Sequence, residues 1–231
     1  VVLGAAAGVV LGLAVWPRGA AGQLARSLAD AIGACGDLVA ATVQRRLRPV
    51  GLEMLSRLRS RARTTALRAD GVLAVLLTER PKVEEFALWE QMSVFVHTRW
   101  YGAEMLARQP VALPPPEAAK VVDALVERLD DLRTAHAAVA AAIARGERPP
   151  LVQAPIDVDR LDAPSRELAA TPLDDPWAER GVVQILRIRA SIAEITVSLS
   201  RLRDLVVEKM GSSAEPGRPG AVASRLTTDP G

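Results

Sequence analysis

The sequence predicts an all-α fold, because aliphatic residues dominate it and recur at helical spacing. Apolar residues make up 49% of the 231 residues and aromatic residues only 3%, whereas a β-sandwich draws on aromatic and β-branched residues. Successive stretches carry apolar residues three and four positions apart, as amphipathic helices do. We therefore expect the end of a transmembrane helix at 1–17, a cytoplasmic bundle of about five long helices with coiled-coil-like packing at 18–210, and a disordered tail at 211–231.

The first segment, Val1 to Trp16, carries no charge and is followed by Pro17 and Arg18. As a helix it would cover about 24 Å, most of the roughly 30 Å hydrocarbon core of a bilayer. Glycines four residues apart would let another membrane helix pack against one face: Gly4, Gly8 and Gly12. Trp16, Arg18 and Arg26 are typical of the membrane interface on the cytoplasmic side.

We interpret this segment as the last part of a membrane helix that enters the cytoplasm. The chain begins without Met, so we also expect further membrane helices upstream. Two other interpretations stay open. One is the apolar core of a secretory signal, which would need a basic region before it and a cleavage site after it. The other is a buried Ala/Gly-rich helix of a soluble domain.

Positive charge is concentrated just after this segment. Residues 18–69 hold ten Arg and three acidic residues, a net charge of +7, and the rest of the chain carries −5. Such charge marks the cytoplasmic side of a membrane helix and attracts anionic head groups, although a solvated basic face is the alternative. We expect no nucleic-acid partner, because no aromatic residue lies between Trp16 and Phe86 to stack on bases. The lone Cys35 suits a reducing compartment.

Local signals place five long helices. They are expected at 19–48, closed by Pro49; at 52–80, which Gly71 would weaken or break; from Pro81 to Arg108; from Glu117 to Gly146; and from Asp175–Pro176 to Lys209 and Gly211. Between the last two lies an irregular, proline-rich connection at 146–176, with one short helical turn between Leu161 and Ala169.

Large side chains gather on the third helix, which carries five of the seven aromatic residues. Four of its residues form a candidate ligand pocket: Trp89, His97, Trp100 and Tyr101. The simpler interpretation, which we favour, is that these residues anchor the core of an otherwise aliphatic bundle. Glu90 and Glu104 each lie two turns from His97, so neither forms a chelating pair with it at i,i+4 spacing.

The last helix has the clearest pattern in the chain. Seven apolar residues follow one another in strict alternation of three and four: Ile185, Ile188, Ile192, Ile195, Leu199, Leu202 and Val206. This alternation predicts a coiled-coil-like seam, either inside the bundle or between protomers.

One junction resembles a known family. The run Leu13-Ala14-Val15-Trp16-Pro17-Arg18 leads into an Ala/Leu/Arg-rich helix at 23–31 and then into further helices. This layout resembles the C-terminal part of the fusaric acid resistance and aromatic acid exporter proteins (FUSC-like membrane proteins). The resemblance implies a bacterial-type inner-membrane protein with several spanning helices, a helical cytoplasmic domain, export of aromatic carboxylic acids, and a homodimer.

The sequence offers no motif for catalysis or for a cofactor. Two histidines and one cysteine are too few for a His/Cys metal cluster, and G-x-S-x-G, P-loop and G-x-G-x-x-G patterns are absent. We therefore predict that the chain is not an enzyme. The resemblance implies the cytoplasmic domain of an exporter, acting in assembly or gating and bound to the bilayer and to upstream membrane helices. The alternative is a membrane-tethered scaffold or regulatory module that binds a partner through the 185–206 seam. A soluble bundle with a buried first helix is a third possibility.

Overall fold

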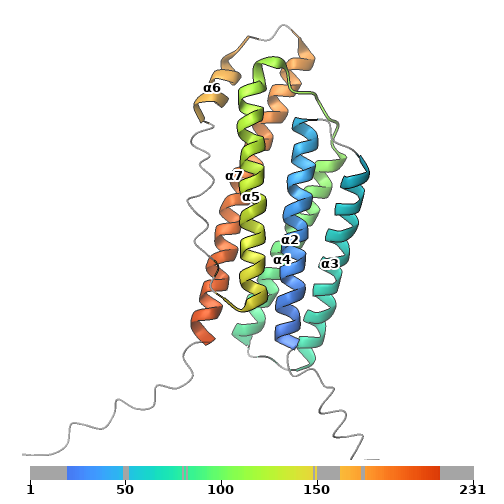
Figure 1. Cartoon of the computed structure of the whole chain (residues 1–231), viewed down its shortest axis with the longest axis vertical. Coiled ribbons are helices and arrows are strands. Elements are labelled where there is room, and N and C mark those ends of the chain that lie inside the picture. Colours follow the sequence, from blue (N-terminus) through green and yellow to red (C-terminus); the bar gives the residue numbers. More distant parts are fainter. Residues whose placement is uncertain are drawn as a thin grey trace, which may run out of the picture.

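The computed structural model describes residues 20–48, 52–79, 81, 83–147, 149, 162–172 and 175–213. Within these ranges the chain forms α-helices and one 3-10 turn and contains no strand, which confirms the predicted all-α fold (Figure 1). The predicted membrane segment, with Gly4, Gly8, Gly12, Trp16 and Arg18, lies outside the described residues. Among the described helices, none combines the length and the apolar character that a bilayer crossing requires.

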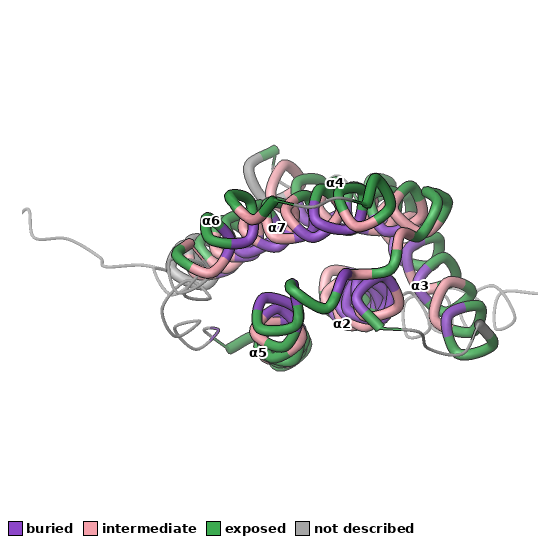
Figure 2. Tube along the Cα trace, turned by 90° about the horizontal axis from the view of Figure 1, so that it is seen from above, coloured by how far each residue is buried: buried purple, intermediate pink, exposed green. Residues whose placement is uncertain are grey.

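Helix α2 (Ala20–Leu47) is the central element of the bundle. It lies between α5 and α3, and a layer made of α4 and α7 runs across one side (Figure 2). Eighteen of its 28 residues are buried, many of them Ala, Gly or Cys, so neighbours approach it from several sides. The sequence predicted both ends of this helix to within one residue. It predicted a single apolar face, however, whereas the helix is buried on several sides.

Helix α3 (Leu52–Thr78) runs without interruption through Gly71, so the predicted break is wrong. A glycine inside a helix costs about 1 kcal/mol relative to alanine, and tertiary packing offsets a cost of this size. Here the packing comes from one buried face of mostly small residues: Leu55, Ala62, Ala66, Ala69 and Leu76. Helix α4 (Val83–Arg108) then returns antiparallel to α3 and begins two residues after Pro81.

A 3-10 turn, η1 (Pro116–Ala118), precedes helix α5 (Ala119–Arg145), so the helix starts slightly later than predicted. It ends as predicted at Gly146, whose φ of 66° is left-handed and whose N–H bonds back to the carbonyls of Ala142 and Ile143. The connection that follows contains helix α6 (Asp162–Ala170), which is longer than the single turn expected there.

Helix α7 (Pro176–Ser213) starts at the predicted cap, where the Asp175 carboxylate accepts the Trp177 N–H at 3.0 Å. It continues two residues past Gly211, the predicted end. All seven residues of the predicted seam are 0–8% exposed and belong to the two core clusters of this chain. The seam is therefore filled by the chain's own helices, α5 and α4 among them. Coiled-coil geometry along it and a homodimer stay predictions.

Candidate functional site

The four residues of the predicted pocket divide into two groups in the structure. His97, Trp100 and Tyr101 form a ring cluster, with centroid distances of 6.1 Å from His97 to Trp100, 6.2 Å from His97 to Tyr101 and 4.7 Å between Trp100 and Tyr101. Trp89, by contrast, is buried in the main core cluster. Tyr101 is exposed and Trp100 is half-buried, so the ring cluster lies at the surface of α4.

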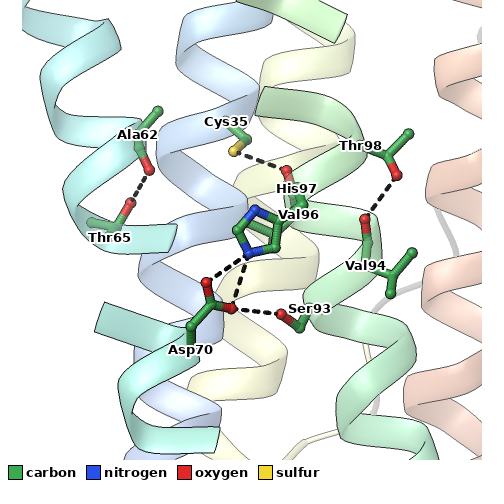
Figure 3. A network of polar contacts seen from close by, with 9 residues as sticks. All are labelled: Cys35, Ala62, Thr65, Asp70, Ser93, Val94, Val96, His97 and Thr98. Carbon is green, nitrogen blue, oxygen red and sulfur yellow. Dashed lines mark hydrogen bonds and ion pairs between the residues drawn. The ribbon is translucent and has the colours of Figure 1, made fainter. Parts of the chain in front are cut away.

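His97 has a partner that the sequence did not reveal. Its Nε2 lies 2.8 and 2.9 Å from the two carboxylate oxygens of Asp70, which comes from α3 (Figure 3). The Ser93 hydroxyl donates to the same carboxylate at 3.0 Å. Because a carboxylate only accepts, this contact requires a proton on Nε2 of His97. The Asp70 carboxylate thus ties α3 to α4 through two donors on adjacent turns of α4.

This geometry favours a helix-to-helix tie over nucleophilic catalysis. A catalytic serine gives its proton to the histidine, whereas Ser93 directs its hydroxyl to Asp70. Among the described residues, no three His, Cys, Asp or Glu side chains are arranged to hold a metal ion. The network therefore holds two helices in register beside an exposed aromatic surface.

A second polar cluster, the Arg46 clamp, joins the C-terminal ends of α2 and α4. Arg46 is only 3% exposed, and its guanidinium donates to the carbonyls of Leu106, Gln109 (2.6 Å) and Pro110 (3.3 Å). The Leu106 carbonyl lies in the last turn of α4 and the Gln109 carbonyl one residue beyond it, where a helix has carbonyls without an i+4 partner. Arg46 thus caps a helix other than its own. Burial lowers the pKa of Arg46, and the charge of the neighbouring Arg45 lowers it further.

Gln184 of α7 completes the Arg46 clamp. Its side-chain oxygen accepts from Arg46 at 3.1 Å and from the Ala112 N–H at 3.0 Å. Its side-chain nitrogen donates to the carbonyls of Arg46 at 3.1 Å and Ala112 at 2.8 Å. One glutamine therefore connects α7 to the end of α2 and to the segment between α4 and α5. The local sequence around Arg46 does not indicate these partners, which stand 60 residues away at Leu106 and 138 residues away at Gln184.

The basic face of α3 is partly neutralised within the chain. Arg57 pairs with Glu53, Arg61 with Asp37, and Arg59 with Glu104 of α4. The hydrogen bonds from Arg59 hold the pKa of Glu104 below its usual value. Arg26, one of the predicted interface residues, is exposed near the start of α2. The surface available to anionic lipid therefore carries less free charge than the sequence suggested.

Comparisons with models of protein families, with curated proteins and with solved structures find no match to this chain.

Proposed function

We propose that this chain is the cytoplasmic helical domain of a membrane exporter of the FUSC-like kind, and that it acts in assembly or gating. The proposal rests on the junction that resembles that family and on the position of α2. The apolar segment leads along the sequence into α2, the central helix of the bundle, with 18 of its 28 residues buried. A displacement of the membrane segment would therefore pass directly to the helices that surround α2.

One end of the bundle has features expected next to a membrane. The start of α2, the end of α3 and the start of α4 lie together at this end (Figure 1). Val75 and Leu77 in the last turn of α3, and Val83 at the start of α4, are exposed there. Exposed apolar side chains at this end support contact with lipid or with membrane helices.

Membrane attachment can be tested with the full chain and two matched variants. Leu11→Arg places a charge inside the apolar segment, whereas Gln23→Arg adds the same side chain at an exposed position of α2. After alkaline carbonate extraction, the unchanged chain and Gln23→Arg should stay in the membrane pellet. Leu11→Arg should move toward the supernatant, because a charge at the centre of a membrane helix costs about 2.5–3.5 kcal/mol. Release of the unchanged chain would overturn the proposal.

The gating role needs a separate test in the full-length membrane protein. A short flexible Gly-Ser linker inserted between Gly19 and Ala20 would uncouple α2 from the membrane segment without changing the bundle. Export of an aromatic carboxylic acid such as 4-hydroxybenzoate should then fall, while a linker between Thr171 and Pro172 should leave export unchanged. Export that survives the first insertion would contradict coupling through α2.

The scaffold alternative has less support from the structure. Its proposed binding surface is the seam from Ile185 to Val206, and those residues are buried inside this chain. A partner would have to displace neighbouring helices to reach them.

A further inference from the structure

Arg99 is a buried cation of the bundle. It lies on α4 and is 8% exposed. In the part of the chain that the structure describes, its guanidinium makes no hydrogen bond or ion pair, and its Nε is buried and unpaired. Its Cζ lies over the Phe95 ring, 5.1 Å from the ring centroid. Arginine is rarely buried unless it is paired, because an unpaired buried charge is costly.

Arg99 lines a groove between α4 and α7. The cavity measures about 400 Å³, within the ~300–1,000 Å³ range of small-molecule sites. Its apolar lining comes from Phe95 and Val94 on α4 and from Leu202 and Leu205 on α7. Val94 is exposed, so this apolar surface is open to solvent.

The side chains of the groove that could donate a hydrogen bond are two hydroxyls, two guanidinium groups and the neutral amide of Gln91. Thr98 and Ser198 line it, but both hydroxyls donate to carbonyls of their own helices, at 2.8 and 2.9 Å. Their oxygens can therefore accept a hydrogen bond from a ligand but not donate one. The charged donors left in the lining are the guanidinium groups of Arg99 and Arg201. A ligand held here needs an acceptor, and guanidinium favours a planar anion such as a carboxylate.

Nearby acidic residues limit the charge of that anion. Glu90 lines the groove, and Glu194 on α7 is close enough to interact electrostatically with Arg99. Two arginines and two glutamates leave no net positive charge, so a dianion would meet more repulsion than a monoanion does.

We propose that the groove between α4 and α7 binds an amphipathic monocarboxylate, with its carboxylate on Arg99 and its apolar body along Val94, Leu202 and Leu205. This site goes beyond the proposed role in gating and does not depend on a membrane segment. It gives the buried guanidinium a hydrogen-bond partner, which the described residues do not supply.

Octanoate is a suitable probe, with 1-octanol as its uncharged counterpart and inorganic phosphate as an anion without an apolar body. Calorimetric titration of the full chain, in the same detergent for every variant, should detect octanoate binding and little binding of the other two. Arg99→Gln should weaken octanoate binding at least tenfold. Arg108→Gln, an exposed arginine of α4 outside the groove, should leave it unchanged.

A second variant keeps the test decisive if Arg99→Gln does not fold. Val94→Glu changes an exposed residue at the groove and should also weaken octanoate binding, by charge repulsion. Equal binding of octanol, or octanoate binding that survives both variants, would overturn the proposal. So would a double-mutant cycle in which Arg99 and Glu194 stabilise each other more than tenfold in the unfolding equilibrium, because Glu194 would then be the partner of Arg99.

Discussion

Gly36 of α2 and His136 of α5 touch so closely that no larger residue fits at position 36. A Cβ atom added to Gly36 would lie 2.7 Å from Cβ and 2.8 Å from Cγ of His136, closer than real Cβ contacts come. The His136 ring is fully buried, and its Nδ1 lies 2.8 Å from the Leu132 carbonyl. Because a carbonyl oxygen only accepts, Nδ1 must carry the proton and donate it to this contact. The central helix and α5 therefore meet at a glycine and a neutral histidine.

Gly36→Ala should destabilise the bundle, because α2 and α5 would have to move apart. Overpacking of this kind costs about 1–3 kcal/mol, against a gain of up to about 1 kcal/mol from the better helix propensity of alanine. Gly33→Ala on the same helix is the matched control, since nothing lies within 4 Å of its added Cβ, and it should stabilise. Urea unfolding measures both changes. A stabilising Gly36→Ala would contradict the close contact.

The stability of the protein should fall as the pH falls from 6.5 toward 4. The pKa of His136 is lowered from 6.5 to about 4, mainly by burial; the Leu132 carbonyl opposes this shift, Arg99 adds to it and Asp37 opposes it. The unfolded chain therefore binds a proton in this window and the folded chain does not. The neutral His136 thus contributes about 3 kcal/mol to the free energy of unfolding, and this contribution is fully present above pH 6.5.

The control for this pH dependence is His136→Leu, which cannot be protonated. Unfolding free energies of both proteins, measured between pH 7.5 and 4.5, should differ in slope, with the variant flatter. The carboxylates titrate in both proteins and so cancel in the comparison. If the two curves of unfolding free energy against pH ran parallel, the folded protein would bind a proton at His136 as readily as the unfolded chain does, and the prediction would be wrong.

Arg46→Lys should cost about 2–4 kcal/mol of unfolding free energy, although it keeps the charge. The guanidinium spreads its donors over three carbonyls and Gln184, and a compact ammonium cannot reach all of them. Arg48→Lys, two residues further on, changes only an exposed pair with Asp123 and should cost under about 1 kcal/mol. Equal effects in urea unfolding would contradict the clamp.

The helices were largely predictable because their ends carry local signals. Asp175 and Pro176 start α7, Gly146 ends α5, and both positions agree with the structure. The failures have a tertiary cause. Gly71 does not break α3, because the packing of a whole helix face outweighs the propensity of one residue. The burial of α2 on several sides depends on neighbours from distant parts of the chain.

The polar clusters were not predictable from helical spacing. A search along α4 finds Glu90 and Glu104 on the side of His97, but its partner Asp70 stands 27 residues earlier on α3. Arg46 and Leu106 are separated by 60 residues. Such pairs depend on where two helices cross and on their relative rotation, which no local pattern encodes. Arg99 could have been noticed as a basic residue on a helix rich in core residues.

Asp70 and His97 should stabilise each other by about 1 kcal/mol in a double-mutant cycle. The relevant variants are Asp70→Asn and His97→Gln, measured by urea unfolding at neutral pH. Their side chains are 40% and 27% exposed, so solvent screens the pair and limits the coupling. The coupling should nevertheless exceed that of Glu53 and Arg57, an exposed i,i+4 pair on α3 worth about 0.3–0.5 kcal/mol. Zero coupling would mean that the Asp70–His97 pair does not help to hold α3 and α4 together, and that the neighbouring rings of Trp100 and Tyr101 do not depend on this tie for their position.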